Sequence, residues 1–303
     1  MNTYCIILAV STSMLAAGLA AEDIEPRRWT SLPVGTTVLS VGAIRTDGDI
    51  AFDPVLEIED ATVESTTTVV SVIRAFDLLG QTARLDVRLP HKHSRWEGLL
   101  RGEPRSVDRR GPGDPRLRLS INFLGSPALR GREFQAYRAS HPVNTTAGAA
   151  LAVTLPLGEY QNDKLLNLGQ NRFAITPQLG VVHTRGPWSY EVTGSVSFYT
   201  KNSEFLVDHT REQDPIFALQ THAVHTSPGG WWASLSAAYD WGGESAIDGV
   251  AKSDYREDLL YGVAAGFAIA PQATIQIAYV ASRVQTAIGW DSDNFAIGCS
   301  FRF

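Results

Sequence analysis

Apolar and polar residues alternate in several segments of this chain, and this period-2 pattern is the feature that most restricts its fold. In residues 116–123, RLRLSINF, the leucines, the isoleucine and the phenylalanine fall on one side of an extended chain. Residues 188–199, WSYEVTGSVSFY, and 272–279, QATIQIAY, repeat the pattern. Because successive side chains of a β-strand point to opposite faces, each segment predicts a strand with one apolar and one polar face.

Twelve segments are candidate strands, and the connections between them alternate in length. Short links such as 184–187 and 227–230 alternate with long polar connections such as 157–171 and 201–215. An even number of strands, with short turns at one end and long loops at the other, is typical of outer-membrane β-barrels. The candidates lie near residues 36–46, 65–76, 81–89, 114–124, 145–156, 172–183, 188–200, 216–226, 230–241, 258–269, 272–282 and 293–303.

A soluble β-sandwich is the alternative, because it also consists of alternating strands. Two features favour the barrel. In residues 261–269, small residues alternate with large apolar ones, and aromatic residues gather near the strand ends, as in the interfacial girdles of membrane barrels. We therefore predict an all-β fold: a transmembrane antiparallel β-barrel of about twelve strands over residues 36–303, with short periplasmic turns and long extracellular loops. Residues 125–143 are too long for a short turn and predict a short periplasmic helix.

The N-terminus predicts export. Residues 4–20 are apolar, and the small residues Gly18 and Ala20 suit cleavage after Ala20. No Lys or Arg precedes the apolar run, and a buried N-terminal helix is the alternative. We expect residues 1–20 to be a signal peptide and residues 21–35 to be a periplasmic segment ahead of the barrel. The predicted location is the outer membrane of a Gram-negative bacterium.

The C-terminal residues 294–303, NFAIGCSFRF, alternate and end on an aromatic residue. Their apolar set, which includes Cys299, would face acyl chains, and the strand would pair with the first one to remove both sheet edges. A terminal Phe303 also resembles the signal that barrel-assembly machinery reads. The expected partners are therefore this machinery, outer-membrane lipid, lipopolysaccharide and small-molecule solutes. No basic and aromatic surface suggests nucleic acid as a partner.

Several segments resemble the outer-membrane transporter family linked to meta-pathway phenol degradation. They are TDGDIAFDPVLEIEDA (46–61), RAFDLLGQTARLDVRLP (74–90), RWEGLLRGEP (95–104), GDPRLRLSINFLGSPAL (113–129) and GAALAVTLPLGEYQNDKLLNLGQNRF (148–173). The resemblance covers most of the mature chain and is most specific in its first half. It implies a barrel in the outer membrane that passes aromatic or other small organic compounds, and it brings no catalytic residue.

Charged residues on the polar faces of the strands are our candidates for the wall of a pore. Charge is costly against lipid, so these side chains belong in a watery lumen or in a paired network. The arginines either favour anionic solutes, as charged rings do in pores, or form a salt-bridged plug that stiffens a narrow barrel. The candidate pore-lining residues are Arg84, Asp86, Arg88, Arg116, Arg118, Arg172, Glu191, Asp240 and Arg302.

Three other motifs contain residue types that serve in catalysis or metal binding. His225 and Ser227 form a His-x-Ser pair like that of an outer-membrane phospholipase, but they adjoin a short turn, and no third triad member is evident. The pair His91 and His93 and the acidic stretch 47–60 could bind a cation, yet the acidic spacing matches no calcium loop. The sequence therefore predicts no catalytic residue, metal site or cofactor.

These observations predict an outer-membrane channel or transporter, not an enzyme, for diffusive uptake of small organic solutes, including aromatic or anionic ones. The alternatives are a non-conducting structural barrel and an outer-membrane lipid-processing enzyme. We expect the long loop at 90–112 to fold inward and gate access to the lumen.

Overall fold

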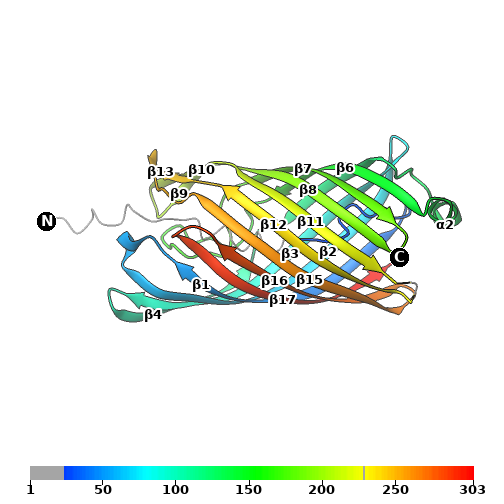
Figure 1. Cartoon of the computed structure of the whole chain (residues 1–303). Helices are drawn as coiled ribbons and strands as arrows, with labels where there is room; N and C mark the ends of the chain where they lie inside the picture. Colours follow the sequence, from blue (N-terminus) through cyan, green and yellow to red (C-terminus); the bar gives the residue numbers. More distant parts are fainter. Residues whose placement is uncertain (1–23, 228) are drawn as a thin grey trace.

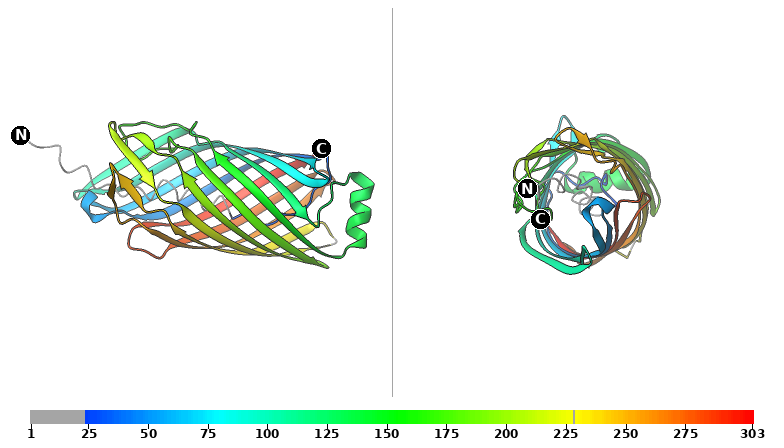
Figure 2. Two further views of the ribbon diagram at one scale, coloured as in Figure 1. Left: turned by 90° about the horizontal axis from the view of Figure 1, so that it is seen from above. Right: turned by 90° about the vertical axis from the view of Figure 1, so that its left-hand side faces the viewer.

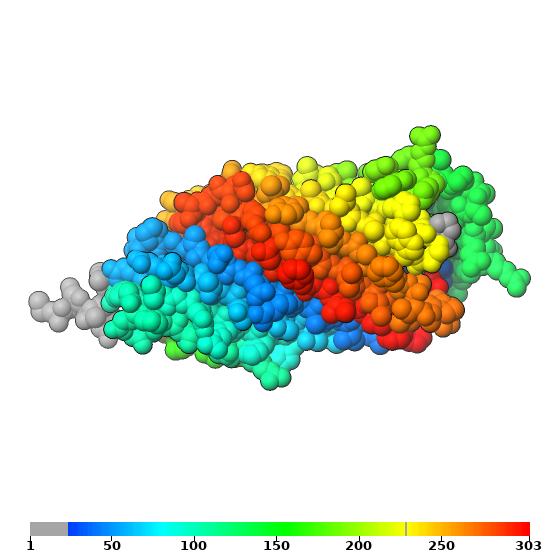
Figure 3. Space-filling model, turned by 60° about the horizontal axis from the view of Figure 1, so that its bottom comes forward, coloured from blue at the N-terminus to red at the C-terminus, as the bar shows by residue number. Residues whose placement is uncertain are grey.

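Twelve antiparallel strands close into a barrel in the computed structural model, which describes residues 24–227 and 229–303 (Figure 1). The first strand, β1 (Thr37–Ala51), pairs with the last, β17 (Gly289–Arg302), and the two lie side by side on the surface (Figure 3). The end-on view in Figure 2 shows a complete ring. This closure satisfies the strand edges, as a sheet in lipid requires. The predicted signal peptide lies outside the described residues.

All twelve predicted strands are present. At 15 and 21 residues, β1 and β2 are longer than the predicted strands 36–46 and 65–76, because both continue into the stretch between those two ranges. The other barrel strands are β2 (Ile58–Leu78), β3 (Gln81–Leu100), β5 (Arg116–Leu124), β6 (Val143–Thr154), β7 (Ala174–Arg185), β8 (Trp188–Tyr199), β11 (Ile216–Thr226), β12 (Trp231–Gly242), β15 (Arg256–Ala270) and β16 (Ala273–Val284).

Short turns lie at one end of the barrel, which we call the turn end, together with the start of β1 and the end of β17 (Figure 1). The predicted helix is present there as α2 (Gly131–Ser140), and Phe134 is its buried residue. The left view of Figure 2 shows α2 lying across this end. The opposite end, which we call the loop end, carries the long connections. By the usual arrangement of outer-membrane barrels, the turn end is periplasmic.

The loop at 90–112 does not fold inward, so that prediction is wrong. Residues His91–Leu100 of β3 pair with β4 (Glu103–Pro112) on one side and with β2 on the other. The turn between β3 and β4 contains Arg101 and Gly102, both at positive φ, as a tight hairpin needs. Because β2 and β4 both form hydrogen bonds with the backbone of β3, the hairpin of β3 and β4 extends the barrel wall at the loop end.

The other loops at this end carry small elements of their own. A 3-10 helix, η2 (Pro54–Leu56), lies between β1 and β2. Four short strands form a second sheet from the connections that follow β8 and β12: β9 (Asn202–Phe205), β10 (His209–Gln213), β13 (Ser245–Ile247) and β14 (Val250–Ala251).

The barrel has an apolar outside and a polar inside, the reverse of a soluble core. Large apolar side chains such as Leu119, Leu235 and Ile297 are exposed on the outer face, whereas Thr193 and Gln220 are buried inside. Because the apolar residues occupy every second position of the strands, the chain can be 44% hydrophobic and still show only short alternating runs. Among the described residues, no helix is both long and apolar enough to cross a membrane.

Candidate functional site in the barrel lumen

Residues 24–36, which we call the N-terminal segment, run inside the barrel before β1 begins (Figures 1 and 2). The sequence led us to expect residues 21–35 in the periplasm ahead of the barrel; the described part of that segment enters the lumen instead. Its side chains make the difference, because Glu25 and Trp29 both bond to inward-facing residues of the wall. A linker without such groups would gain no contacts with the wall on entering the lumen and would remain in water.

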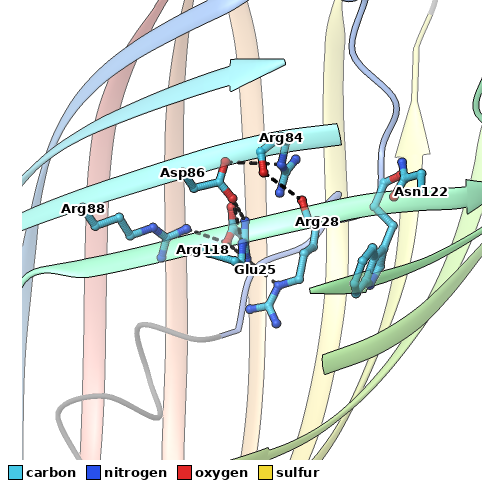
Figure 4. A network of polar contacts seen from close by, with 9 residues as sticks. Glu25, Arg28, Arg84, Asp86, Arg88, Arg118 and Asn122 are labelled. Atoms are coloured by element: carbon cyan, nitrogen blue, oxygen red, sulfur yellow. Dashed lines mark hydrogen bonds and ion pairs between the residues drawn. The ribbon is translucent and has the colours of Figure 1, made fainter. Parts of the chain in front are cut away.

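The Glu25 carboxylate meets arginines of two neighbouring strands (Figure 4). Its Oε2 accepts hydrogen bonds from Arg88 at 2.5 Å and from Arg118 at 3.3 Å, and Arg28 Nε lies 4.0 Å from the same oxygen. Burial alone would raise the pKa of the Glu25 carboxyl, but these arginines and Arg84 hold that pKa well below its usual range. Glu25 is therefore an ionised carboxylate at neutral pH.

The part of the wall that Glu25 contacts is strongly basic. Asp86 and Arg118 are direct partners in the β3–β5 register, and both are buried; Arg118 Nε donates to Asp86 at 2.7 Å, and a second guanidinium nitrogen bonds to the same carboxylate. Arg84 Nε lies 3.3 Å from the other Asp86 oxygen. We call the set Arg84, Asp86, Arg88, Arg116 and Arg118 the arginine cluster. It combines four arginines with one aspartate.

Trp29 fits a recess in the wall formed by β6, β7 and β8. Its side chain is 1% exposed, and its Nε1 donates to Thr193 Oγ1 at 2.8 Å. The recess exists because Gly148 and Gly180 are paired across β6 and β7. A Cβ at Gly180 would lie 2.0 Å from the indole nitrogen, and one at Gly148 would lie 2.6 Å from the ring. The wall is thus shaped to hold this indole.

Arg27 of the N-terminal segment contacts another part of the wall. The guanidinium of Arg27 lies over the Trp232 ring, 5.2 Å from its centroid. Burial lowers the pKa of Arg27, and the nearby Glu191 carboxylate counteracts this. Glu191, 1% exposed, faces His222 in the β8–β11 register. The segment therefore contacts the wall on both sides of the lumen.

The structure places the other predicted pore residues apart from the arginine cluster. Asp240 is buried on the inner face of β12. Arg172 lies before β7, not on it; its guanidinium bonds to Gln170 Oε1 at 3.1 and 3.2 Å and lies 4.3 Å from the Tyr199 ring centroid. Arg302 is exposed at the turn end, where it donates to the Pro271 carbonyl oxygen at 3.1 Å.

A separate apolar contact between loops lies at the loop end. Phe205 and Ile247 are buried in one apolar cluster, with Leu56, Leu165 and Leu206 packed against them. We call these five residues the loop cluster. They come from four different connections, and the β1–β2 connection of Leu56 lies on nearly the opposite side of the ring from the β8–β11 connection of Phe205. The loop cluster therefore reaches across the mouth of the barrel.

The catalytic and metal-binding candidates do not assemble into sites. His225 packs beside Trp188 and Trp231, with ring centroids 4.9 and 5.4 Å apart, and Ser227 Oγ accepts a hydrogen bond from the Gly229 amide. His93 bonds to Asp108 at 3.1 Å on the exposed hairpin. Within the described residues, no group of three or more metal-ligating side chains could hold an ion.

The sequence grouped the arginines of β3 and β5 but missed the residues that occupy the lumen, Glu25, Arg27, Arg28 and Trp29. The signal was present as EPRRW in residues 25–29, a charged and aromatic run in a stretch where a simple linker would need neither kind of residue. The loop cluster gave no signal, because its apolar residues are isolated in polar loops.

A closed barrel with an apolar outer face and a polar interior defines an outer-membrane β-barrel protein. Residues 54–297, more than half of the chain, match the family described as "Putative MetA-pathway of phenol degradation". The chain belongs to this family, as the resemblance in its sequence predicted.

Solved structures support the same fold. An outer membrane channel from Pseudomonas putida F1 has a TM-score of 0.74 and 21% identity, covering 93% of this chain and 100% of that chain. The translocator domain of the autotransporter NalP from Neisseria meningitidis has a TM-score of 0.50 and 11% identity, covering 97% of this chain and 100% of that chain. At these identities the likeness concerns the fold alone. No curated protein sequence matches the chain.

Proposed function

We propose that this protein is an outer-membrane channel for the diffusive uptake of small organic solutes, including aromatic and anionic ones. The observation that carries the proposal is the way in which the N-terminal segment is held inside the lumen. Residues 24–30 contain no strand or helix and contact the wall of the lumen largely through side chains, so they can leave without unpairing any barrel strand. A barrel with a purely structural role would need no such removable occupant.

Two further facts support this proposal. The family description refers to phenol degradation, and the Pseudomonas putida F1 relative is described as an outer membrane channel. Passage of phenolic or other aromatic compounds would agree with both. The arginine cluster, with Glu191, Asp240 and Arg172, would line the path and favour anions over cations.

The proposed route to the membrane follows from the two ends of the chain. Residues 1–20 would direct export and be removed, and the C-terminal strand ending at Phe303 would be read by the barrel-assembly machinery. Exposed apolar residues such as Phe295 and Phe301 would then face acyl chains, and the charged outer ends of the strands would face lipopolysaccharide.

The test is permeation through proteoliposomes. The purified full-length mature chain is reconstituted, and the influx of benzyl alcohol, benzoate and a sugar of similar size is followed by light scattering. The proposal predicts faster influx of the organic solutes than in protein-free liposomes. If neither the native chain nor a Glu25→Gln, Trp29→Ala double variant admits any solute, the barrel is a structural one and the proposal fails.

A further inference from the structure

We propose that the Glu25 carboxylate occupies a binding site for organic carboxylates. An incoming carboxylate would then compete with Glu25 and release the start of the N-terminal segment from the arginine cluster. This inference rests on the proposed function, because it describes which solute class opens the obstructed lumen.

The chemistry of the contact is that of carboxylate recognition. Guanidinium groups of Arg88 and Arg118, from neighbouring strands, converge on the single oxygen Oε2 of Glu25. Charge-assisted hydrogen bonds of this kind are the strong ones, and the planar guanidinium matches a carboxylate. A carboxylate on a free solute could make the same bonds at the same place.

Exposure separates the exchangeable carboxylate from the fixed one. The Glu25 and Arg88 side chains are 27% and 28% exposed, whereas those of Asp86 and Arg118 are 4% and 6% exposed. Asp86 also belongs to the wall and cannot leave. Glu25 lies ahead of β1 and takes part in no strand pairing, so it is the partner that a solute in the lumen can reach and replace.

Exchange would leave no charge unmatched. If Glu25 simply left, Arg88 and Arg118 would lose the carboxylate that they share, and removing the counter-charge of a buried guanidinium such as that of Arg118 is costly. A solute carboxylate would restore the missing negative charge. Departure of Glu25 is therefore unfavourable when nothing replaces it, and it becomes possible when a solute carboxylate takes its place.

The segment has a fixed part and a part that can swing. From Trp29 onward it is held by backbone groups: Asn122 donates to the Trp29 carbonyl oxygen at 3.1 Å, and the amides of Val34 and Gly35 donate to Leu129 and Ala75 at 2.8 and 3.0 Å. Before Trp29, the charged side chains of Glu25 and Arg27 contact the wall, the Arg28 guanidinium lies beside Glu25, and the backbone amides of Arg27 and Arg28 lie near the Glu191 carboxylate. Among the residues that the structure describes, release of Glu25 therefore needs movement of residues 24–28 only.

The test measures ligand binding to the full-length mature chain in detergent by isothermal titration calorimetry. The probes are benzoate, acetate and the neutral isostere benzyl alcohol. The variant Glu25→Gln removes the internal competitor, and Glu57→Gln is the matched control, because it weakens an exposed ion pair with Arg101 on the outer loops. Glu25 lies outside every strand, and retained barrel folding is checked by heat-modifiable gel migration.

We expect Glu25→Gln to bind benzoate and acetate about tenfold more tightly than the native chain, because a tethered competitor acts at an effective concentration on the order of millimolar or above. Benzyl alcohol affinity should not change, and Glu57→Gln should behave like the native chain. Equal benzoate affinity in the native chain and Glu25→Gln, an equal gain for benzyl alcohol, or no benzoate binding to either protein would overturn the inference.

Permeation assays on the same preparations separate this inference from the proposed function. Tighter benzoate binding without any solute influx would retain the carboxylate site and reject the channel. Influx without any change in binding would retain the channel and reject the site.

Discussion

The lumen and its outer mouth are crossed by contacts of opposite chemistry. The N-terminal segment is held by ion pairs with the arginine cluster and by one indole in a fitted recess. The loop cluster at the other end consists of Leu56, Leu165, Phe205, Leu206 and Ile247, which meet through apolar contacts. An ion pair can be exchanged for another ion pair, and an apolar contact for another apolar contact. If the protein is the proposed channel, we expect these two sets of contacts together to favour solutes that combine an apolar body with a carboxylate.

The largest effect should come from removing both anchors of the N-terminal segment. A Glu25→Gln, Trp29→Ala double variant loses the ion pair and the buried indole. Burial of a tryptophan is worth about 3–5 kcal/mol, and each 1.4 kcal/mol is about a tenfold change in an equilibrium. We expect single-channel conductance in planar bilayers to rise by about tenfold or more. The matched control is Trp188→Ala, a tryptophan on the outer face, which should leave conductance unchanged.

The loop cluster can be tested separately with Phe205→Ala, which removes a side chain that is 1% exposed. A cavity of this kind costs about 3–5 kcal/mol, here within the loops and not in the barrel wall. We expect the loops at 200–215 to become sensitive to protease and benzyl alcohol influx to rise several-fold. Phe217→Ala, on the outer face of β11, is the control. Unchanged protease resistance would mean that the loop cluster does not hold the mouth closed.

A smaller effect on conductance is expected when the Trp29 recess is filled by a new side chain than when both anchors are removed. In Gly180→Ala the new Cβ would overlap the Trp29 indole, so the ring must shift and lose its bond to Thr193. We expect conductance to rise, but less than in the double variant, because Glu25 still holds the segment. Gly194→Ala is the control, since a Cβ there meets nothing within 4 Å. Equal conductance of both glycine variants would contradict the role of the recess.

The smallest effect concerns pH. The neighbouring arginines hold the pKa of Glu25 well below the ordinary value of a glutamate, so the stabilisation from its ion pairs is complete above the ordinary carboxyl pKa and is lost as pH falls through the lowered value. We therefore expect no Glu25-dependent change in conductance from neutral pH down to about 5. At more acidic pH the native chain should conduct more, and Glu25→Gln should lack this component. An equal acid response in both proteins would assign the effect to other groups.

Much of the barrel could be predicted from the sequence because a strand's periodicity is local. The alternation in residues 116–123 and 188–199 indicates strands directly, and closure through Phe303 follows from the same rule. The arginine cluster was predicted because Arg84, Arg88, Arg116 and Arg118 lie on polar faces of neighbouring strands, and register brings such faces together.

The missed features depend on contacts between distant parts of the chain. Glu25 binds residues 63 and 93 positions away, and Trp29 bonds to a residue 164 positions away, so no local pattern marks these partners. The hairpin formed by β3 and β4 was mistaken for an inward loop because its polar residues hide the pairing with β2. Arg172 was assigned to a strand that begins two residues later, a difference that moves it into the loops.

The most direct test of the account follows the N-terminal segment itself. In a chain that lacks residues 1–20, and Cys5 with them, the substitutions Cys299→Ala and Ile24→Cys leave a single thiol, one residue before Glu25. Its reaction with a bulky, water-soluble maleimide is timed by gel shift in proteoliposomes, with and without benzoate or benzyl alcohol. The account predicts slow labelling that benzoate accelerates in a saturable way and that benzyl alcohol does not. A labelling rate that benzoate leaves unchanged would contradict the claim that the segment yields its site to a carboxylate.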